Sequence, residues 1–170
     1  MIPSVSSERR NYIPIGLLAP TVIASNLCLV VPGAGPYELG VVSSSMHMAW
    51  VRYVAGRLES RYRYSNQVVY NNFPWPREPS EAQKQAVEQA AQAVLDARAK
   101  FPGASLADLY DPLAMPPELR RAHQDLDRAV DAAYGRKKFA ADAERVAFLF
   151  DLYRQYTSLL PAEKGRRGRK

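Results

Sequence analysis

The sequence predicts an α+β fold, in which short mixed β-strands with one helix precede a bundle of three helices. Two observations predict this class. The first 76 residues are interrupted by Pro and Gly and are rich in β-branched and aromatic residues, which is typical of short strands. From residue 77 onward, apolar residues recur at spacings of three and four, the period of helices with one buried face. We therefore divide the chain into residues 1–76, a helical domain at 77–162, and a basic tail at 163–170 that we expect to be disordered.

The first half predicts strands around a single helix. Ala-Pro and Pro-Gly turns separate three runs with strand character, at residues 12–18, 21–31 and 37–42. Serines at 43–45 offer an N-cap for the helix, and Gly56 is placed to end it as a C′ residue. Residues 59–65 and 67–73 then return to strand or extended character.

The second half carries the signals of helix ends. Ser80 and Gln83 form a capping-box pattern before a helix that we expect to reach Phe101. Pro116 and Pro117 are suited to the start of the second helix. A loop at 134–138 leads to the third helix. Its apolar face is predicted to carry Val146, Leu149, Phe150, Tyr153, Thr157 and Leu160.

The charge is positive but unevenly distributed. The 170 residues have a formal net charge of +6, and residues 1–76 contribute six arginines against three glutamates. Cys28 is the only cysteine, which excludes an intramolecular disulfide and a cysteine-rich zinc site. The apolar runs are shorter than the roughly 20 residues of a membrane span, and the N-terminus lacks a signal-peptide pattern. We expect a soluble, cytoplasmic protein without membrane contact.

Candidate catalytic groups are few. His47 and His123 each lie on a predicted helix, where a structural role is the more common one. The chain contains none of the nucleotide-binding, metal-binding or nucleophile motifs with characteristic spacing. We therefore expect no catalytic residue, no metal site and no cofactor site within these residues.

Residues 56–76, rich in Arg, Tyr and Asn with Glu59 as the only acid, indicate a recognition surface. The arginine fork reads guanine, and a glutamate accepts a hydrogen bond from cytosine. Because side chains alternate along a strand, we expect Glu59, Arg61 and Arg63 on one face and Ser60, Tyr62 and Tyr64 on the other. Glu59 and Arg61 could read the two members of one base pair, or they could pair with each other. The candidate contacts to the DNA backbone are Arg9, Arg10, Arg52, Arg57 and Arg63.

Three stretches of the sequence carry a family resemblance. Residues 5–18, 43–76 and 109–135 resemble, in the same order, the C-terminal third of MmeI-like enzymes. These are large single chains that join a nuclease, an adenine-N6 DNA methyltransferase and a target recognition domain. The resemblance implies that residues 1–76 are the end of the target recognition domain and that 77–162 form the helical domain that follows it.

The resemblance also implies a role for one residue pair. Glu59 and Arg61 fall on a family specificity position, where Glu/Arg implies cytosine on the strand that carries the methylated adenine. The family's S-adenosylmethionine-binding and nuclease motifs are absent from these 170 residues. S-adenosylmethionine and Mg are therefore expected for the parent enzyme only.

The expected function is sequence-specific recognition of double-stranded DNA, within an enzyme whose remaining domains are further partners. The alternative is a protein-interaction or scaffold module that docks on other parts of a larger chain. In either case, surface that other domains would cover could allow the fragment to form a homo-oligomer.

Overall fold

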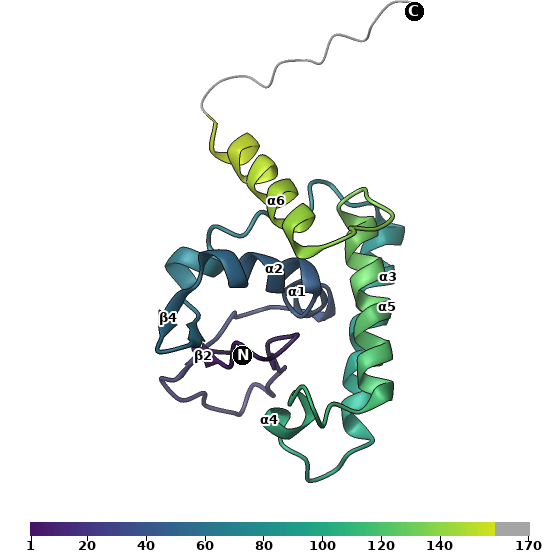
Figure 1. Ribbon diagram of the computed structural model, residues 1–170. Helices are drawn as coiled ribbons and strands as arrows, with labels where there is room; N and C mark the ends of the chain where they lie inside the picture. The colour runs from purple at the N-terminus through teal and green to yellow at the C-terminus, as the bar shows by residue number, and fades with distance from the viewer. Residues whose placement is uncertain (159–170) are drawn as a thin grey trace, which may run out of the picture.

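The computed structural model describes residues 1–158 and confirms the α+β class. Short antiparallel strands and long irregular segments lie on one side of the molecule, and most of the helices lie on the other (Figure 1). The predicted tail at 163–170 and Leu160 of the predicted third helix lie outside the described residues.

The strands form two small antiparallel sheets. In the first, β1 (Ile2–Pro3) pairs with β3 (Cys28–Leu29). In the second, β5 (Arg61–Arg63) is the central strand, between β2 (Val5–Ser6) and β4 (Gly56–Leu58). The second sheet thus joins the N-terminus of the chain to a hairpin more than fifty residues later.

Two α-helices lie between these strands, where the sequence predicted one. Helix α1 spans Pro36–Val42, and α2 spans Ser45–Val54 with Ser44 as its N-cap. The predicted serine cap is confirmed, since the Ser44 hydroxyl accepts a hydrogen bond from the His47 amide. Gly56 follows the helix as expected, but it opens strand β4 instead of adopting a left-handed C′ conformation.

Four helices follow the hairpin and a π-helical turn, η1 (Asn66–Tyr70). They are α3 (Glu81–Ala99), α4 (Leu106–Leu109), α5 (Pro117–Ala133) and α6 (Asp142–Thr157). Both capping-box hydrogen bonds between Ser80 and Gln83 are present, and Pro117 occupies the first turn of α5. The predicted signals at these two helix starts are therefore confirmed.

The three long C-terminal helices do not form a self-contained bundle. Helices α3 and α5 pack side by side, whereas α6 crosses over to pack on α2 of the first half (Figure 1). Helix α6 packs on α2 because the aromatic rings of Phe150 and Tyr153 contact Trp50 of α2. Their ring centroids lie 5.1 and 6.0 Å from that of Trp50.

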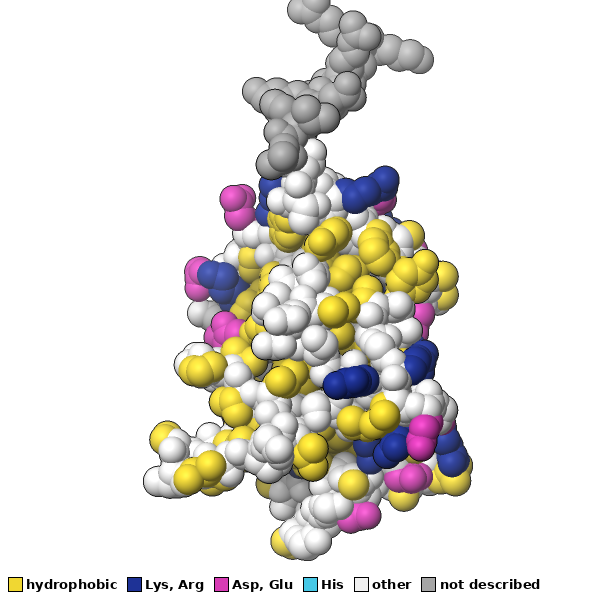
Figure 2. All heavy atoms as spheres, turned by 90° about the vertical axis from the view of Figure 1, so that its left-hand side faces the viewer, with side chains coloured by type: hydrophobic (Ala, Val, Ile, Leu, Met, Phe, Trp, Pro, Cys, Tyr) yellow, Lys and Arg dark blue, Asp and Glu magenta, His cyan; other side chains and the backbone are white. Residues whose placement is uncertain are grey.

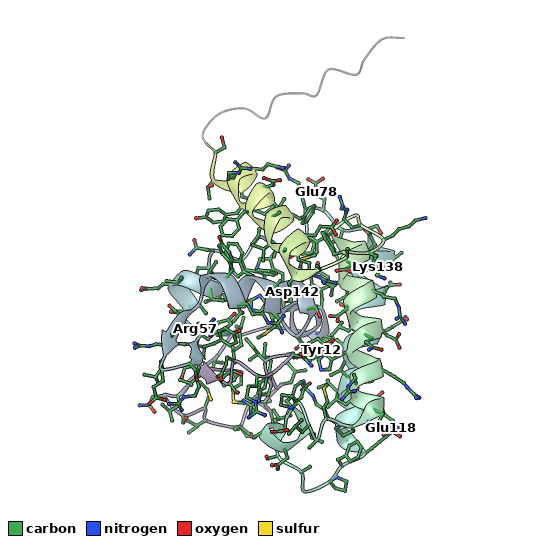
Figure 3. All side chains as sticks on the ribbon, viewed as in Figure 1. Tyr12, Arg57, Glu78, Glu118, Lys138 and Asp142 are labelled. Atoms are coloured by element: carbon green, nitrogen blue, oxygen red, sulfur yellow. The ribbon has the colours of Figure 1, made fainter. Side chains whose placement is uncertain are left out.

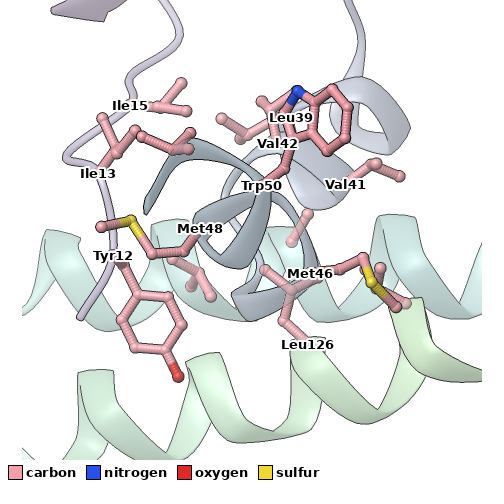
Figure 4. Packing of buried hydrophobic residues seen from close by; sticks show 14 of the residues in the cluster. Tyr12, Ile13, Ile15, Leu39, Val41, Val42, Met46, Met48, Trp50 and Leu126 are labelled. Carbon is pink, nitrogen blue, oxygen red and sulfur yellow. The ribbon is translucent and has the colours of Figure 1, made fainter. Parts of the chain in front are cut away.

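The core is continuous across both halves. Trp50, Met46 and Met48 of α2 are buried, and Leu126 of α5 is fully buried beside them. Figure 4 shows α2 lying against α5, with Tyr12 from the N-terminal segment reaching the same helix. Because one core serves both halves, the strands are held in place by the helices.

Two predicted strands were wrong. Residues 12–18 are irregular although Tyr12, Ile13 and Ile15 are buried, because they fill the core without pairing in a ladder. Residues 37–42 belong to α1, which Gly35 and Pro36 begin.

Two further segments differ from the prediction. Of residues 21–31, only Cys28–Leu29 pairs as a strand. Residues 67–73 contain the end of η1 rather than a strand. The Ser65 hydroxyl accepts from the Val68 amide there and so caps a turn of helix instead.

Candidate functional site

The most exposed regular element of the first half is the hairpin of β4 and β5. Leu58 pairs with Arg61, which leaves Glu59 and Ser60 as a two-residue loop. Glu59 has a φ of 57°. A positive φ at the first loop position is typical of hairpin turns and favours glycine, and the left-handed conformation costs another residue roughly 1–2 kcal/mol. Glu59 and Glu78, with a φ of 50°, are the non-glycine residues with a positive φ in the described part of the chain.

Glu59 and Arg61 contact each other at the tip of the hairpin. Arg61 Nη2 donates to Glu59 Oε2 over 2.8 Å, and the side chains are 46% and 78% exposed. The pairing that the sequence left open is therefore formed. Glu59 lies in the turn and not on the strand, so only Arg61 and Arg63 share the solvent face of β5.

The opposite face of β5 anchors the hairpin. Tyr62 and Tyr64 are buried, as the predicted alternation requires. The Tyr64 amide donates to the Ser4 carbonyl over 2.8 Å, and the Tyr64 hydroxyl lies 2.8 Å from Nε2 of His47. Burial lowers the pKa of His47 to about 3 and raises the pKa of Tyr64. Both groups are therefore neutral near pH 7, and they fix the strand on α2.

Arg57 lies on the Tyr62 side of the hairpin, because these two residues are paired across β4 and β5. Its guanidinium carbon lies 4.1 Å from the centroid of the Tyr62 ring, and Nη1 donates to the Ser60 carbonyl over 3.0 Å. Arg57 therefore contacts the turn that carries Glu59.

A hollow of about 690 Å³ lies beside the hairpin, and Arg63 of β5 is among the residues that line it. The full lining is Ser4, Val5, Asn26, Leu27, Leu29, Gly56, Leu58, Arg63, Tyr64, Ser65, Asn66 and Val68. Asn26 was not among the predicted contacts, although it is a polar residue inside the apolar run 21–31.

The remaining predicted arginines separate into two groups. Arg9 and Arg10 follow β2, where the chain turns at residues 8–9 before it returns to the core at Tyr12. Arg52 instead forms an ion pair with Asp142 at the start of α6. Figure 3 shows Arg57 at the edge of the molecule, on a different part of it from Asp142. Arg9 is exposed and Arg10 is half-buried, whereas Arg52 contacts Asp142 between α2 and α6.

The face that contains the hairpin is mostly uncharged. Figure 2 shows apolar and neutral atoms over much of this side of the molecule, with charged side chains scattered among them. Several large apolar side chains are exposed in the loop of residues 17–30, and Ile23 is 95% exposed.

Among the described residues, no group of His, Cys, Asp and Glu is arranged to hold a metal ion. Within residues 1–158, no helix is both long enough and apolar enough to cross a membrane.

Both parts of the chain match domains of known proteins. Residues 1–77 match the model of the MmeI target recognition domain, and residues 79–161 match the model of the MmeI C-terminal domain. DNA methyltransferase A of Bacillus subtilis (strain 168) is 48% identical over 157 residues, which cover 92% of this chain and 18% of the relative.

A solved structure shows the same fold. It is that of the type IIL restriction-modification enzyme MmeI in complex with DNA, with a TM-score of 0.88 and 53% identity. The match covers 93% of this chain and 21% of that one, so the chain spans about a fifth of the length of the proteins it resembles. The chain therefore belongs to the MmeI family and joins the family's target recognition domain to its C-terminal domain.

Proposed function

We propose that this chain recognises double-stranded DNA within a longer adenine-N6 methyltransferase and endonuclease, and that Glu59 and Arg61 read one base pair. The observation that carries the proposal is the position of the two side chains. They lie on an exposed two-residue turn, and Glu59 adopts a backbone conformation that favours glycine. The DNA-bound MmeI structure supports the choice of ligand.

The pair is suited to exchanging partners on binding. An exposed ion pair contributes about 0–1 kcal/mol, so separating Glu59 from Arg61 costs little. Arginine on guanine and glutamate on cytosine each contribute roughly 1–3 kcal/mol of discrimination. A G·C pair can therefore compete for both side chains, with Arg61 donating to guanine and Glu59 accepting from cytosine. The family resemblance favours cytosine on the strand with the methylated adenine.

The hairpin has the dimensions for such contacts, because the major groove admits a two-stranded β-ribbon. Arg63 lies on the hairpin, and Arg9 and Arg10 follow the strand that pairs with it. These three are proposed contacts to phosphates, which position a protein without specifying sequence. Arg52 pairs with Asp142, and the salt dependence of DNA binding decides whether it also contacts a phosphate.

The chemistry is proposed to reside elsewhere in the longer enzyme. S-adenosylmethionine would supply the methyl group and Mg would serve the nuclease, each bound by domains outside these residues. Those domains are the further proposed partners, and the cytoplasm, which holds bacterial DNA, is the proposed location.

A second candidate function is docking on other protein surfaces. Exposed apolar side chains in the loop favour it, namely Leu17, Leu18, Val22, Ile23, Leu27 and Val30. Such a patch would also allow the isolated chain to form homo-oligomers. Sedimentation of the isolated chain with and without Ile23→Ser would test this, since a docking patch predicts self-association that the substitution weakens.

The test of the proposed function is to exchange the two charges. In the full-length enzyme, Glu59→Lys with Arg61→Asp should change the base pair accepted at one position of the methylated site. Lys and Glu have similar backbone preferences at the strained position 59, so the exchange changes the chemistry more than the turn. Sequencing of methylated genomic DNA gives the site, and methylation of the same sites by the variant would overturn the proposal.

A further inference from the structure

Arg57 differs from Arg61 and Arg63 because it lies on the face of the hairpin that carries the buried Tyr62 ring. Its guanidinium lies over the Tyr62 ring at 4.1 Å, and its Nη1 donates to the carbonyl of Ser60 over 3.0 Å. Arg61 and Arg63 are on the other side of the sheet, since Arg57 is paired with Tyr62. Arg57 was among the predicted phosphate contacts, and its position in the structure offers a different role.

The two contacts of Arg57 connect the buried ring of Tyr62 to the strained turn of Glu59 and Ser60. Tyr62 is 5% exposed and lies in the central strand, so its ring is held by the core. Ser60 follows Glu59, whose φ of 57° is the strained position of the turn. A planar guanidinium that stacks on the ring and bonds to the carbonyl of Ser60 therefore restrains the loop that presents Glu59. Recognition of a base edge requires such restraint, because small displacements of the reading group remove its hydrogen bonds.

We propose that Arg57 and the Tyr62 ring are positioning residues, which hold the Glu59–Ser60 turn in the geometry that reads a base pair. The inference rests on the proposed function of Glu59 and Arg61. It assigns Arg57 an effect on discrimination at one base pair, whereas a phosphate contact would affect binding equally at all sequences.

The test uses Arg57→Lys and Arg57→Ala in the full-length enzyme. Methylation rates are measured on duplexes that carry the cognate site, determined by sequencing of methylated DNA, and on duplexes altered at single base pairs. Lysine keeps the charge but loses the planar fork that stacks and donates together. Both variants should lower discrimination about tenfold at the base pair that Glu59 and Arg61 read, and leave discrimination at the other positions unchanged.

Tyr62 provides the matched pair of variants. Tyr62→Phe retains the ring under the guanidinium and should leave discrimination unchanged, whereas Tyr62→Leu should reproduce the effect of Arg57→Ala. Because Tyr62→Leu also opens the core, the Arg57 variants carry the decision. Arg57 is exposed, so its replacement leaves the fold intact.

The outcomes separate this inference from the proposed function. If Arg57→Ala weakens methylation of all sites equally and Arg57→Lys restores it, Arg57 contacts phosphate and the inference is wrong. Unchanged discrimination in both variants also overturns it. The Glu59→Lys, Arg61→Asp variant is assayed alongside. If that variant keeps the original site, the proposed function itself fails, whatever the Arg57 variants do.

Discussion

Asp127 on α5 accepts hydrogen bonds from both the backbone amide and the hydroxyl of Ser45, the first residue of α2. The two bonds measure 2.6 and 2.7 Å, and the Tyr12 hydroxyl donates to the same carboxylate over 2.8 Å. Tyr12 and Ser45 belong to the part that matches the target recognition domain, and Asp127 belongs to the part that matches the C-terminal domain. One carboxylate thus fastens the two parts together.

Replacing Asp127 with Ala should therefore destabilise the whole chain. The variant leaves the Ser45 amide and two hydroxyls without their acceptor in a site that is mostly buried, and each lost partner costs roughly 1–3 kcal/mol. We expect the free energy of unfolding in urea to fall by at least about 2 kcal/mol.

Asp125→Ala is the matched control on the same helix. Asp125 pairs with Arg128, and both side chains are more than half exposed. A surface pair of this kind contributes about 0–1 kcal/mol. Equal losses in the free energy of unfolding for the two variants would contradict the role of Asp127 between the two parts of the chain.

Both histidines of the chain should remain neutral in mildly acidic solution. Burial lowers the pKa of His47 and of His123 to about 3, and for His123 the nearby Arg98 contributes as well. Nε and Nη2 of Arg98 both donate to the Tyr110 hydroxyl and occupy its two lone pairs, so Tyr110 must use its own proton toward Nε2 of His123, 2.6 Å away. A proton on that nitrogen would have no acceptor.

The NMR signals of the two imidazole rings measure this directly. Neither should shift between pH 8 and pH 5, since the folded pKa lies well below that range. Because unfolded histidine titrates near 6.5, the unfolded state binds protons that the folded state does not. Stability should therefore fall as pH decreases below about 6.5, by roughly 1 kcal/mol for each histidine at pH 5.5. A ring that titrates near 6.5 in the folded chain would refute the assignment.

The buried aspartates act in the opposite direction. Burial raises the pKa of Asp127 and Asp131, so protonation of these groups favours the folded state as pH decreases. Their contribution offsets part of the histidine effect in denaturation curves. The NMR titration separates the two, because it follows each histidine ring by itself.

Gly40 should not tolerate a side chain. A Cβ at this position of α1 would lie 2.7 Å from Cγ1 of Val87 and 3.2 Å from the Val87 carbonyl oxygen. Overpacking of this kind costs roughly 1–3 kcal/mol, against a gain in helix propensity of about 1 kcal/mol. Gly40→Ala should therefore lower the midpoint of urea denaturation.

Gly16→Ala is the control for Gly40. There the nearest atom to a new Cβ is Cδ1 of Leu106 at 3.6 Å, an ordinary contact. The substitution should leave stability unchanged or raise it slightly, since alanine restricts the unfolded chain. An equal loss in both variants would show that the α1–α3 contact does not depend on a small residue at position 40.

The sequence was informative where a local signal decides the structure. The Ser44 and Ser80 caps are such signals, as is the proline at the start of α5, because each satisfies or tolerates free amides of a helix end. The pairing of Glu59 with Arg61 was also among the predicted possibilities, since it needs only two residues close in the chain.

The predictions from the sequence failed where residues distant in the chain determine the local structure. Residues 37–42 are too few to show a helical period, and α1 is held by the approach of Gly40 to Val87 in a later helix. Helix α6 buries Leu149 and packs Phe150 and Tyr153 inward as predicted, but Thr157 is exposed, Leu152 is buried in its place, and no local pattern reveals that Trp50 is what the helix covers. The ion pair of Arg52 with Asp142 was likewise not visible in the sequence, because ninety residues separate the two.

The salt dependence of DNA binding should distinguish Arg9 from Arg52. A protein that neutralises phosphates loses affinity for DNA as salt rises, and each contact contributes about 0.9 to the slope of log K against log salt concentration. Arg9 is exposed on the turn that follows β2, the strand paired with β5, so Arg9→Gln in the full-length enzyme should reduce the slope by about one. Arg52→Gln should leave it unchanged, because the guanidinium is held by Asp142. Fluorescence anisotropy with a labelled cognate duplex at several salt concentrations gives both slopes. A reduced slope for Arg52→Gln would mean that DNA competes with Asp142 for this arginine, and the α2–α6 surface would then belong to the interface.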